Sequence, residues 1–403
     1  MAKPLGFLKR KTPEVALLVE TSTTYGRDVL SGIAAYVREN GPWSVKLEQR
    51  SIREGMPNWL RRWRGDGIIS RLPLLEMAEF SRRTGIPVID MNEQIADLGL
   101  PLVFNDQQAI GRIAAEHLLE RGFKQFAYIG QRGGFWSDGR WEGFSTAVAQ
   151  AGYPCYEFVG KGRTMADYQR RIWETETPLV AQWVADLPKP IGVMACNAFR
   201  ACQLLDACRQ VGVAVPEQVA VIAGDEEEVA CRMAIPALSA VVNSGRQIGY
   251  QAARMLDRLM HGQPLEQTKV FIPPERVITR QSTDILAIND PLVAKALEFI
   301  RHYACQGIQV EDVLQAVDVS RSTLQKRFRQ VLGRTIHDLI LKFRIQRVKA
   351  LLAETSLPLE EVAERAGFKY VQYMSEVFYQ QMGIRPGKFR LQHRLQPKIP
   401  LVK

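Results

Sequence analysis

Short apolar runs alternate with longer amphipathic stretches along the first two thirds of the chain. An apolar run, a polar loop and an amphipathic stretch, in that order, are typical of a strand followed by the helix that covers a parallel sheet. The apolar runs predict strands at Val15–Val19, Val45–Gln49, Gly67–Ile69, Pro87–Asp90, Leu102–Phe104, Phe126–Ile129, Ile191–Met194 and Val219–Ala223. The amphipathic stretches predict helices at Arg27–Glu39, Gln107–Arg121, Arg140–Ala151, Ala198–Val211 and Arg246–His261. We therefore expect an α/β fold of parallel sheets covered by helices.

The same succession of elements recurs on both sides of Phe104–Asn105, as it would in two similar lobes joined in series. In open parallel sheets, ligands bind beyond the carboxyl ends of the strands. The side chains that directly follow the predicted strands are therefore the first candidates for a functional site.

The pattern changes near residue 281. Residues 282–291 are rich in Ser, Thr, Asp and Asn and end on a proline, which is typical of a linker. Helical periodicity then continues almost unbroken to His393, and no run of residues predicts a strand. The sequence thus predicts a two-lobed α/β domain over residues 12–281, a linker over 282–291 and an all-helical domain over 292–395.

Two stretches of the helical domain have the form of a helix-turn-helix. In the first, a helix over residues 310–316 and a turn over 317–320 precede a second helix, Ser322–Val331, which Ser320 caps. The apolar side chains of this second helix recur at helical spacing and are expected to face inward: Leu324, Phe328 and Val331.

The second stretch repeats this design. A helix at Leu359–Arg365 and a turn with Gly367 at its corner precede a helix at Tyr370–Met382. The helix predicted between the two stretches, Ile336–Ala353, is long enough at about 1.5 Å per residue to hold them one DNA turn, about 34 Å, apart. The spacing would let one chain place two helices in successive major grooves.

Charge supports an anionic partner for this domain. The chain holds 53 Lys and Arg against 43 Asp and Glu, a net charge of +10, and residues 285–403 alone hold 19 against 11. Basic helices are often no more than solvated faces, but two such units in the most basic region favour DNA binding. The polar stripes of the two second helices give the expected DNA-facing residues: Ser322, Gln325, Lys326, Arg329, Gln372, Tyr373, Ser375 and Glu376.

Side chains suited to a sugar follow several strands of the α/β domain. Sugar hydroxyls need carboxylate, amide and guanidinium partners, and an aromatic ring suits the apolar face. We expect seven residues to line a sugar-binding cleft between the lobes: Tyr25, Arg27, Asn92, Trp136, Arg140, Asn197 and Asp225.

Structural roles remain open for some of these residues. Asp225 could cap a turn, Asn197 could be the N-cap of the helix that follows it, and Trp136 could be a packing residue. Arg27 could pair with Asp28 or Glu20 on the surface. We interpret the acidic run over residues 226–228 as a solvated loop rather than a metal site.

Several classes of protein are disfavoured. No apolar run approaches the roughly 20 residues of a membrane-spanning helix, and the first residues lack the pattern of a signal peptide. The six cysteines form no CxxC pair, and the five histidines are scattered. Dinucleotide-binding, P-loop, GxSxG and HExxH motifs are missing. We expect a cytoplasmic protein with no catalytic residues, no metal and no cofactor.

Motifs in the last quarter of the chain resemble the AraC-type DNA-binding domain. The first half of that domain is matched by Val319–Phe328 (VSRSTLQKRF), and the second half by Pro358–Ala363 (PLEEVA) and Ala366–Phe368. The resemblance implies a double helix-turn-helix and the DNA-facing positions given above. The chain departs from the family at Tyr373-Met374, and at Glu376 and Tyr379, where basic residues are common in the family.

The front part resembles the periplasmic-binding-protein-like effector domain of LacI-type regulators. The matching segments are Ala114–Gly122 (AAEHLLERG), Phe126–Gly130 (FAYIG) and Val219–Asp225 (VAVIAGD). The resemblance implies that sugar binds between two lobes, with Arg140, Asn197 and Asp225 matching the family's sugar-contacting positions best.

The two domains together resemble the family of xylose operon activators over the full length of the chain. That resemblance implies a D-xylose-dependent activator of xylose catabolic genes that binds operator DNA as a homodimer and works with RNA polymerase. Three other readings stay open: a regulator of another sugar, a sugar-processing enzyme with an accessory helical domain, and an architectural DNA binder that responds to no sugar.

Overall fold

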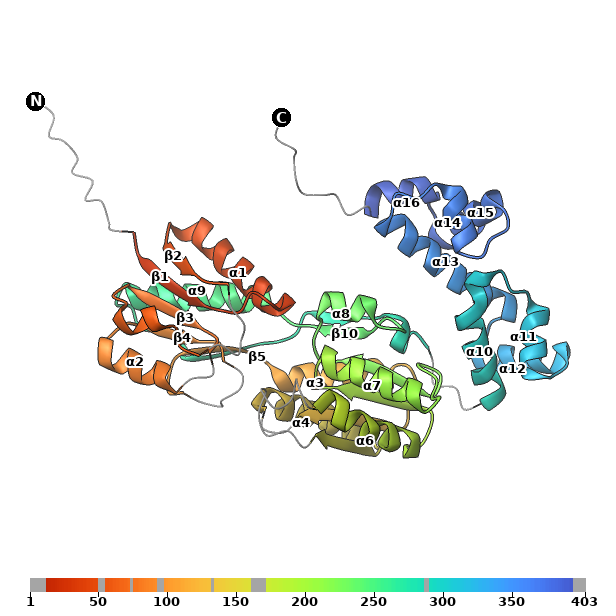
Figure 1. Ribbon diagram of the computed structural model, residues 1–403, viewed down its shortest axis with the longest axis horizontal. Coiled ribbons are helices and arrows are strands. Elements are labelled where there is room, and N and C mark those ends of the chain that lie inside the picture. Colours follow the sequence, from red (N-terminus) through yellow and green to blue (C-terminus); the bar gives the residue numbers. More distant parts are fainter. Residues whose placement is uncertain are drawn as a thin grey trace, which may run out of the picture. The chain divides into compact units, whose positions relative to one another are not determined.

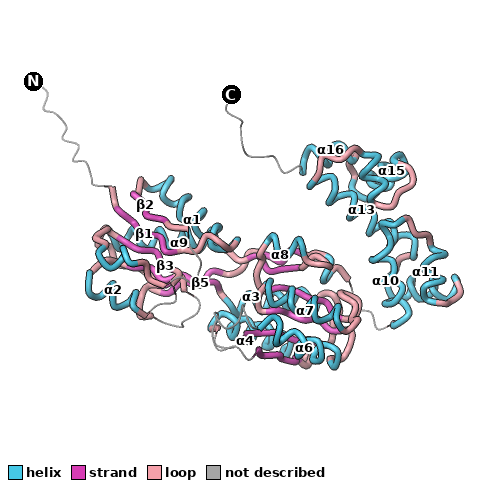
Figure 2. The backbone as a smooth tube through the Cα atoms, viewed as in Figure 1, coloured by secondary structure: helices cyan, strands magenta, loops and turns pink. Residues whose placement is uncertain are grey.

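The computed structural model describes residues 12–49, 55–72, 75–92, 98–131, 134–160, 172–285 and 290–393. The chain divides into two compact units, residues 1–285 and 286–403, and each is described by itself below. Figure 1 follows the chain through both units, and Figure 2 shows that all described strands fall in the first unit, where they form two separate sheets.

The first lobe of unit 1 is built on a six-stranded, wholly parallel sheet with strand order β11-β5-β4-β3-β1-β2. Its strands are β1 Glu14–Leu18, β2 Ser44–Leu47, β3 Gly67–Ser70, β4 Val88–Asp90, β5 Leu102–Asn105 and β11 Lys269–Ile272. Its helices are α1 Thr24–Asn40, α2 Glu76–Thr84 and α9 Gly245–Met260, with a short 3-10 helix at Asn58–Arg62. Strand β3 and most of β1 are buried, which is why they read as continuous apolar runs in the sequence.

The second lobe has a six-stranded sheet with the order β12-β10-β9-β8-β6-β7, in which only β12 is antiparallel to its neighbour. Its strands are β6 Phe126–Gln131, β7 Cys155–Gly160, β8 Ile191–Ala195, β9 Val219–Ala223, β10 Ser239–Val242 and β12 Arg276–Ile278. Its helices are α3 Gln107–Leu119, α4 Phe135–Gln150, α6 Ile172–Asp186, α7 Ala198–Gln210 and α8 Glu228–Met233.

The lobes do not simply follow each other in series, as the sequence pattern had predicted. The chain passes from the first lobe to the second after β5, returns to the first lobe for α9 and β11, and enters the second again at β12. Strand β11 completes the first sheet by pairing Lys269 with Leu102 of β5. Figure 1 shows α9 beside α1 on the first sheet, although more than 200 residues separate them in the sequence.

The end of unit 1 is anchored where the sequence had predicted a linker. Ser282 and Thr283 lie in a short 3-10 helix and are fully buried, so the residues from 282 to 285 belong to unit 1 and the linker is shorter than predicted. The Ser282 hydroxyl donates to the carbonyl of Val221 in β9 at 2.6 Å. The Thr283 hydroxyl lies 2.7 Å from Nε2 of His117 on α3 and 2.6 Å from the Ser239 hydroxyl.

Helices are the regular secondary structure among the described residues of unit 2, as the sequence predicted. Its helices are α10 Pro291–Tyr303, α11 Val310–Val317, α12 Arg321–Leu332, α13 Ile336–Glu354, α14 Leu359–Arg365, α15 Val371–Met382 and α16 Pro386–His393, with a 3-10 turn at Ala304–Gln306. Asp290 caps α10, accepting from the backbone N–H of Val293 at 3.3 Å, and therefore belongs to this unit rather than to a linker.

Arg344 of α13 holds the two halves of unit 2 together. The side chain is buried, its Nε donates to the Ala304 carbonyl at 2.8 Å and its Nη2 to the Ile308 carbonyl at 2.7 Å. Its guanidinium carbon also lies 5.6 Å from the centre of the Phe368 ring in the second half. Two carbonyls of the first helix-turn-helix half and an aromatic ring of the second therefore share one cation.

His117 makes the stability of unit 1 depend on pH. Burial, with a smaller contribution from Arg121, lowers the pKa of His117 to about 3. Below about pH 6.5 the unfolded chain therefore binds a proton that the folded chain excludes. As the pH is lowered from about 6.5 to about 3, the free energy of unfolding decreases by about 1.4 kcal/mol per pH unit. We expect wild type to lose about 2 kcal/mol more than His117→Gln between pH 7.5 and pH 5.

Urea unfolding followed by tryptophan fluorescence measures this difference, because all seven tryptophans lie between Trp43 and Trp183, within unit 1. His261→Gln is the matched control, since the His261 side chain at the end of α9 is 40% exposed. An identical pH dependence for wild type and His117→Gln would contradict the prediction.

Candidate functional site

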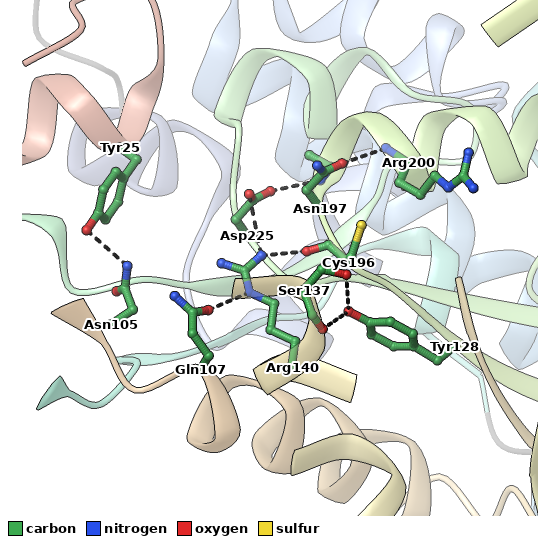
Figure 3. A network of polar contacts seen from close by, with 11 residues as sticks. Tyr25, Asn105, Gln107, Tyr128, Ser137, Arg140, Cys196, Asn197, Arg200 and Asp225 are labelled. Carbon is green, nitrogen blue, oxygen red and sulfur yellow. Dashed lines mark hydrogen bonds and ion pairs between the residues drawn. The ribbon is translucent and has the colours of Figure 1, made fainter. Parts of the chain in front are cut away.

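Arg140 on α4 is the centre of a polar cluster at the carboxyl ends of the second-lobe strands. The residue is 3% exposed, and its Nε donates to Oε1 of Gln107 at 2.8 Å. Its Nη1 donates to the Cys196 carbonyl directly after β8 and lies 3.7 Å from Oδ2 of Asp225, two residues after β9. Figure 3 shows the remaining nitrogen, Nη2, pointing toward the side on which Tyr25 and Asn105 of the first lobe lie.

Asp225 is held in place by both a charge and a backbone group. Its Oδ1 accepts from the backbone N–H of Ala198 at 2.8 Å, and its Oδ2 faces Arg140. Loss of hydration outweighs the opposing effect of Arg140 and raises the pKa of Asp225, although the side chain remains 34% exposed. The carboxylate is therefore fixed, partly accessible and able to accept further hydrogen bonds.

Asn197 performs the structural role that the sequence had left open. Its Oδ1 accepts from the backbone N–H of Arg200 at 2.8 Å, which makes it the N-cap of α7. The cap uses only the carbonyl oxygen of the side chain. Its Nδ2 has no hydrogen bond among the described residues, and Asn197 lies directly beside Cys196, whose carbonyl binds Arg140.

Trp136 packs against the central cation instead of presenting an open ring. The residue is 6% exposed, and the guanidinium carbon of Arg140 lies 5.1 Å from the centre of its ring. Trp136 lies on the same helix as Arg140, and its ring helps to fix the orientation of the guanidinium. Trp136 is therefore both a packing residue and a support of the cluster.

Gln107 belongs to this cluster and was missed at the sequence level. It is the first residue of α3, 6% exposed, and accepts from Arg140 through Oε1. Its Nε2 is buried and makes no hydrogen bond to any described residue. The signal was present, because Asn105, Asp106 and Gln107 form a polar run at the carboxyl end of a predicted strand.

The first lobe contributes Tyr25 through α1. Its hydroxyl accepts from Nδ2 of Asn105 at 3.0 Å, and the guanidinium carbon of Arg71 lies 4.5 Å from the centre of its ring. Arg71 in turn pairs with the buried Glu20, two residues after β1. Asn105, Arg71 and Glu20 are polar residues of this region that the sequence analysis did not select, and Figure 3 shows Tyr25 and Asn105 together.

The two remaining predicted sugar-site residues differ in burial. Asn92 is fully buried after β4, with its backbone N–H bonded to Oδ1 of Asp90 at 2.8 Å. Arg27 is half-exposed and does not pair with Asp28 or Glu20, the two surface partners that the sequence analysis had left open. Its guanidinium donates to the Thr21 carbonyl at 3.1 Å and lies 3.9 Å from Oε1 of Glu227 in the second lobe.

Glycines bring α3 and α4 close enough for Gln107 to reach Arg140. A Cβ at Gly143 would lie 2.0 Å from the Gln108 carbonyl oxygen, and one at Gly111 would lie 2.1 Å from the Arg140 carbonyl oxygen. Only glycine permits this approach of two helix backbones. The same device joins α1 and α9 in the first lobe, where a Cβ at Gly249 would meet the Val29 carbonyl at 2.0 Å.

The first helix-turn-helix of unit 2 has the predicted form with one difference. Leu324 and Phe328 of α12 are fully buried, but Val331 is 37% exposed, so the prediction that it faces inward was wrong. The inward stripe ends one turn early because α12 ends at Leu332. Ser320 caps α12 as predicted, accepting from the Thr323 N–H at 3.3 Å.

The predicted DNA-facing residues of α12 lie on the solvent side of the helix. Ser322, Lys326 and Arg329 are exposed, and Gln325 is half-buried. Arg327 is instead used within the unit, where it pairs with Asp290 at 2.8 Å. Burial opposes ionisation of that carboxyl, but the hydrogen bonds from Arg327 and the α10 backbone outweigh it, so the pKa of Asp290 is lowered.

Helix α15 of the second half presents a polar and aromatic face. Gln372, Tyr373 and Glu376 are exposed and Ser375 is half-buried, while Met374 and Phe378 are buried as predicted. The turn before it contains Gly367 at a φ of +80°, where an added Cβ would also lie 2.7 Å from the Ala304 carbonyl. The corner glycine is therefore required both by the turn and by the contact between the two halves.

Comparisons with known families cover both units. Residues 14–163 match the family of periplasmic binding proteins and sugar binding domains of the LacI family, and residues 115–283 match a periplasmic binding protein-like domain. Residues 313–392 match a helix-turn-helix domain. Among the described residues, no helix could cross a membrane and no group of side chains could hold a metal ion.

Several similar proteins match the chain over nearly its whole length. The xylose operon regulatory protein of Haemophilus influenzae is 33% identical over 94% of this chain and 98% of its own. The xylose operon regulatory protein of Escherichia coli K12 is 30% identical over 94% and 97%. A solved structure of a xylose-binding transcription activator covers 95% of this chain and 99% of its own, with 29% identity and a TM-score of 0.81.

The contact between α3 and α4 gives a testable requirement at Gly143. Alanine is the better helix former by about 1 kcal/mol, but its methyl group would meet backbone, and overpacking of this kind typically costs about 1–3 kcal/mol. We expect Gly143→Ala to lower the free energy of unfolding of unit 1 by about 1–3 kcal/mol in urea. Thr146→Ala, exposed on the same helix, is the control, and equal stability of the two variants would refute the requirement.

Proposed function

Because the chain belongs to the family of xylose operon regulatory proteins, we propose that it activates transcription in response to D-xylose bound at the Arg140 cluster. The chain is a transcriptional regulator with a helix-turn-helix DNA-binding domain and not an enzyme. The relatives' names carry the choice of sugar. The observation that carries the choice of site is the set of fixed, incompletely used polar groups around Arg140.

The chemistry of the Arg140 cluster suits a small polyol. Asp225 offers a fixed carboxylate that accepts from hydroxyls, whereas Nη2 of Arg140 and Nε2 of Gln107 are donors for hydroxyl or ring oxygens. Gln107 already accepts from Arg140, so its orientation is set before ligand binds. A ligand with closely spaced hydroxyls, each both donor and acceptor, can satisfy these groups together.

In the first lobe, Tyr25 and Asn92 are the residues that we propose to meet the sugar from the opposite side. Tyr25 is held by Asn105 and lies against Arg71, so its ring and hydroxyl are oriented. A sugar bound by both lobes favours the arrangement of the lobes in which both sets of contacts are made. Asn197 and Trp136 serve the site through the α7 cap and the support of Arg140.

Unit 2 is proposed to read an operator through α12 and α15. Gln325 and Gln372 offer amide pairs for base edges, and Glu376 can accept from cytosine. Lys326 and Arg329 suit phosphates, which fix the position of a helix in the groove. We further propose that the active form is a homodimer that works with RNA polymerase in the cytoplasm.

The sugar site is tested by Asp225→Asn. The asparagine amide keeps a carbonyl oxygen that can accept from the Ala198 N–H, but it has no negative charge. A hydrogen bond from a sugar hydroxyl to a charged carboxylate contributes about 1.5–3 kcal/mol, and the variant loses this contribution. We expect the dissociation constant for D-xylose, measured by isothermal calorimetry, to rise about 10- to 100-fold. Operator affinity without sugar should stay the same.

Asp206→Asn is the matched control for this variant, because Asp206 lies on α7 of the same lobe and pairs with Arg209 at the surface. If Asp225→Asn binds D-xylose as tightly as Asp206→Asn does, the sugar does not bind at this cluster. If wild type prefers another pentose or a hexose, the site stands and the effector is corrected.

Two substitutions on α12 separate base reading from phosphate binding. Gln325→Ala should reduce discrimination at one base pair by about 1–3 kcal/mol, because an amide reads base edges. Lys326→Ala should weaken binding to all sequences and lower the slope of log affinity against log salt by about 1. Binding titrations with operator and mutated operators at several salt concentrations measure both effects.

Gln306→Ala is the control for both, since Gln306 is exposed in the 3-10 turn at Ala304–Gln306, outside the two proposed reading helices. Equal losses on specific and random DNA for Gln325→Ala and Lys326→Ala would contradict this division of roles.

A further inference from the structure

The acidic run after β9 is not the solvated loop that the sequence suggested. Asp225 belongs to the Arg140 cluster, as described above. Glu226 and Glu227, the next two residues, are only 16% and 18% exposed in their side chains, and each is paired with a different part of unit 1. Glu228, at 52% exposure, pairs with Arg232 at the surface within α8.

Glu227 connects the second lobe to the first. Its Oε2 accepts from the backbone N–H of Thr24 at 2.9 Å, and its Oε1 accepts from the Thr24 hydroxyl at 2.7 Å. Thr24 is the first residue of α1, so the carboxylate lies at the positive end of that helix. Arg27, one turn along α1, adds a longer contact of 3.9 Å to the same carboxylate.

Glu226 points to a different element, the segment through which the chain leaves unit 1. Its carboxylate pairs with Nη2 of Arg280, and both side chains are largely buried, at 16% and 14% exposure. Arg280 is fixed on its other side, because Nη1 donates to the Leu238 carbonyl at 2.9 Å. The pair therefore joins the loop after β9 to residues 279–285.

Residues 279–285 are the last part of unit 1 before the chain continues into unit 2. Besides Arg280, the segment is held by Ser282 and Thr283, which are buried against β9, α3 and β10. Arg121, two residues after the end of α3, also donates to the Thr283 carbonyl at 2.7 Å. These hydrogen bonds fix residues 279–285 against β9, β10 and the α3 region of the second lobe.

We propose that residues 225–227 form a relay that couples sugar binding to the exit of the chain toward the DNA-binding unit. The inference rests on the proposed function and assigns its regulation to the Glu226–Arg280 pair. Adjacent Cα atoms are about 3.8 Å apart, so these residues cannot move independently. A sugar that engages Asp225 and favours the Glu227 contact between the lobes also sets the position of Glu226, and through Arg280 that of residues 279–285.

The relay is tested in the full-length chain by Glu226→Gln, which keeps the size of the side chain and removes its charge. The quantity to measure is the coupling factor, the ratio of operator dissociation constants without and with saturating D-xylose. We expect the factor to fall at least about fivefold toward one, since allosteric coupling is typically about 5- to 150-fold. Affinity for D-xylose without DNA should stay within about twofold of wild type.

Glu228→Gln is the matched control and should retain the coupling factor of wild type. The reciprocal measurement, D-xylose affinity with and without operator, must give the same factor, because coupling free energy is shared by both ligands. If Glu226→Gln binds D-xylose normally and keeps the wild-type factor, the relay is wrong while the proposed function stands. If wild type binds no D-xylose, the proposed function and the relay fall together.

Arg280→Lys tests the same pair if Glu226→Gln does not fold. Lysine keeps the charge but cannot donate from two fixed nitrogens to Glu226 and the Leu238 carbonyl at once. We expect a reduced coupling factor with D-xylose affinity retained, and an unchanged factor would overturn the relay. In the Glu226→Gln/Arg280→Lys double variant, the loss should not exceed that of the stronger single variant, because both changes break one interaction.

Discussion

A guanidinium taken out of water must be surrounded by partners, and the arrangement of the second lobe around Arg140 meets that constraint. Removing such a charge from water costs several kcal/mol unless hydrogen bonds and opposite charge replace the lost hydration. Arg140 obtains them from the first residue of α3, the end of β8 and the loop after β9. Side chains that are far apart in the sequence are thereby fixed at one edge of the sheet.

The glycines of α3 and α4 are part of the same constraint. Gln107 reaches Arg140 only because Gly111 and Gly143 allow the two helix backbones to touch. Unit 2 solves a similar problem with Arg344, which satisfies carbonyls of one helix-turn-helix half and stacks on Phe368 of the other. In both units a buried arginine orients polar groups on separate elements, while apolar packing supplies most of the stability.

The local sequence pattern predicted most helices of unit 2 closely, but it did not predict which distant elements contact one another. Helix α14 has the predicted bounds, α11 and α13 extend one residue further at one end, and α12 extends one residue further at each end. The agreement is close because amphipathic spacing and caps are local signals. Val331 was misplaced because periodicity alone does not show where a helix leaves the core. Strands β7, β10, β11 and β12 and helices α2, α6 and α8 were not predicted. Strands β11 and β12 are short and incompletely buried, so neither forms a continuous apolar run in the sequence.

The same distinction applies to the candidate site. Asp225 and Asn197 follow strands, so the rule about carboxyl ends of strands finds them, and it would also have found Gln107. Arg140 was selected at the start of a predicted helix, but α4 begins five residues earlier, at Phe135. Glu226 and Glu227 were misread because their partners lie 54 and 203 residues away along the chain. No local pattern specifies such contacts, which come from the way the chain passes three times between the lobes.

Those three passages also set the order in which the molecule can be completed during synthesis on the ribosome. Most of the second lobe, from α3 to β10, is one continuous stretch and can form its core as soon as it has emerged. The first lobe begins earlier but lacks α9 and β11 until residue 272 has been made. Until then, β5 lacks its neighbour β11, and α1 lacks the helix α9 that packs against it near Val29. The core of the second lobe, although translated later, can therefore form before the first lobe is complete.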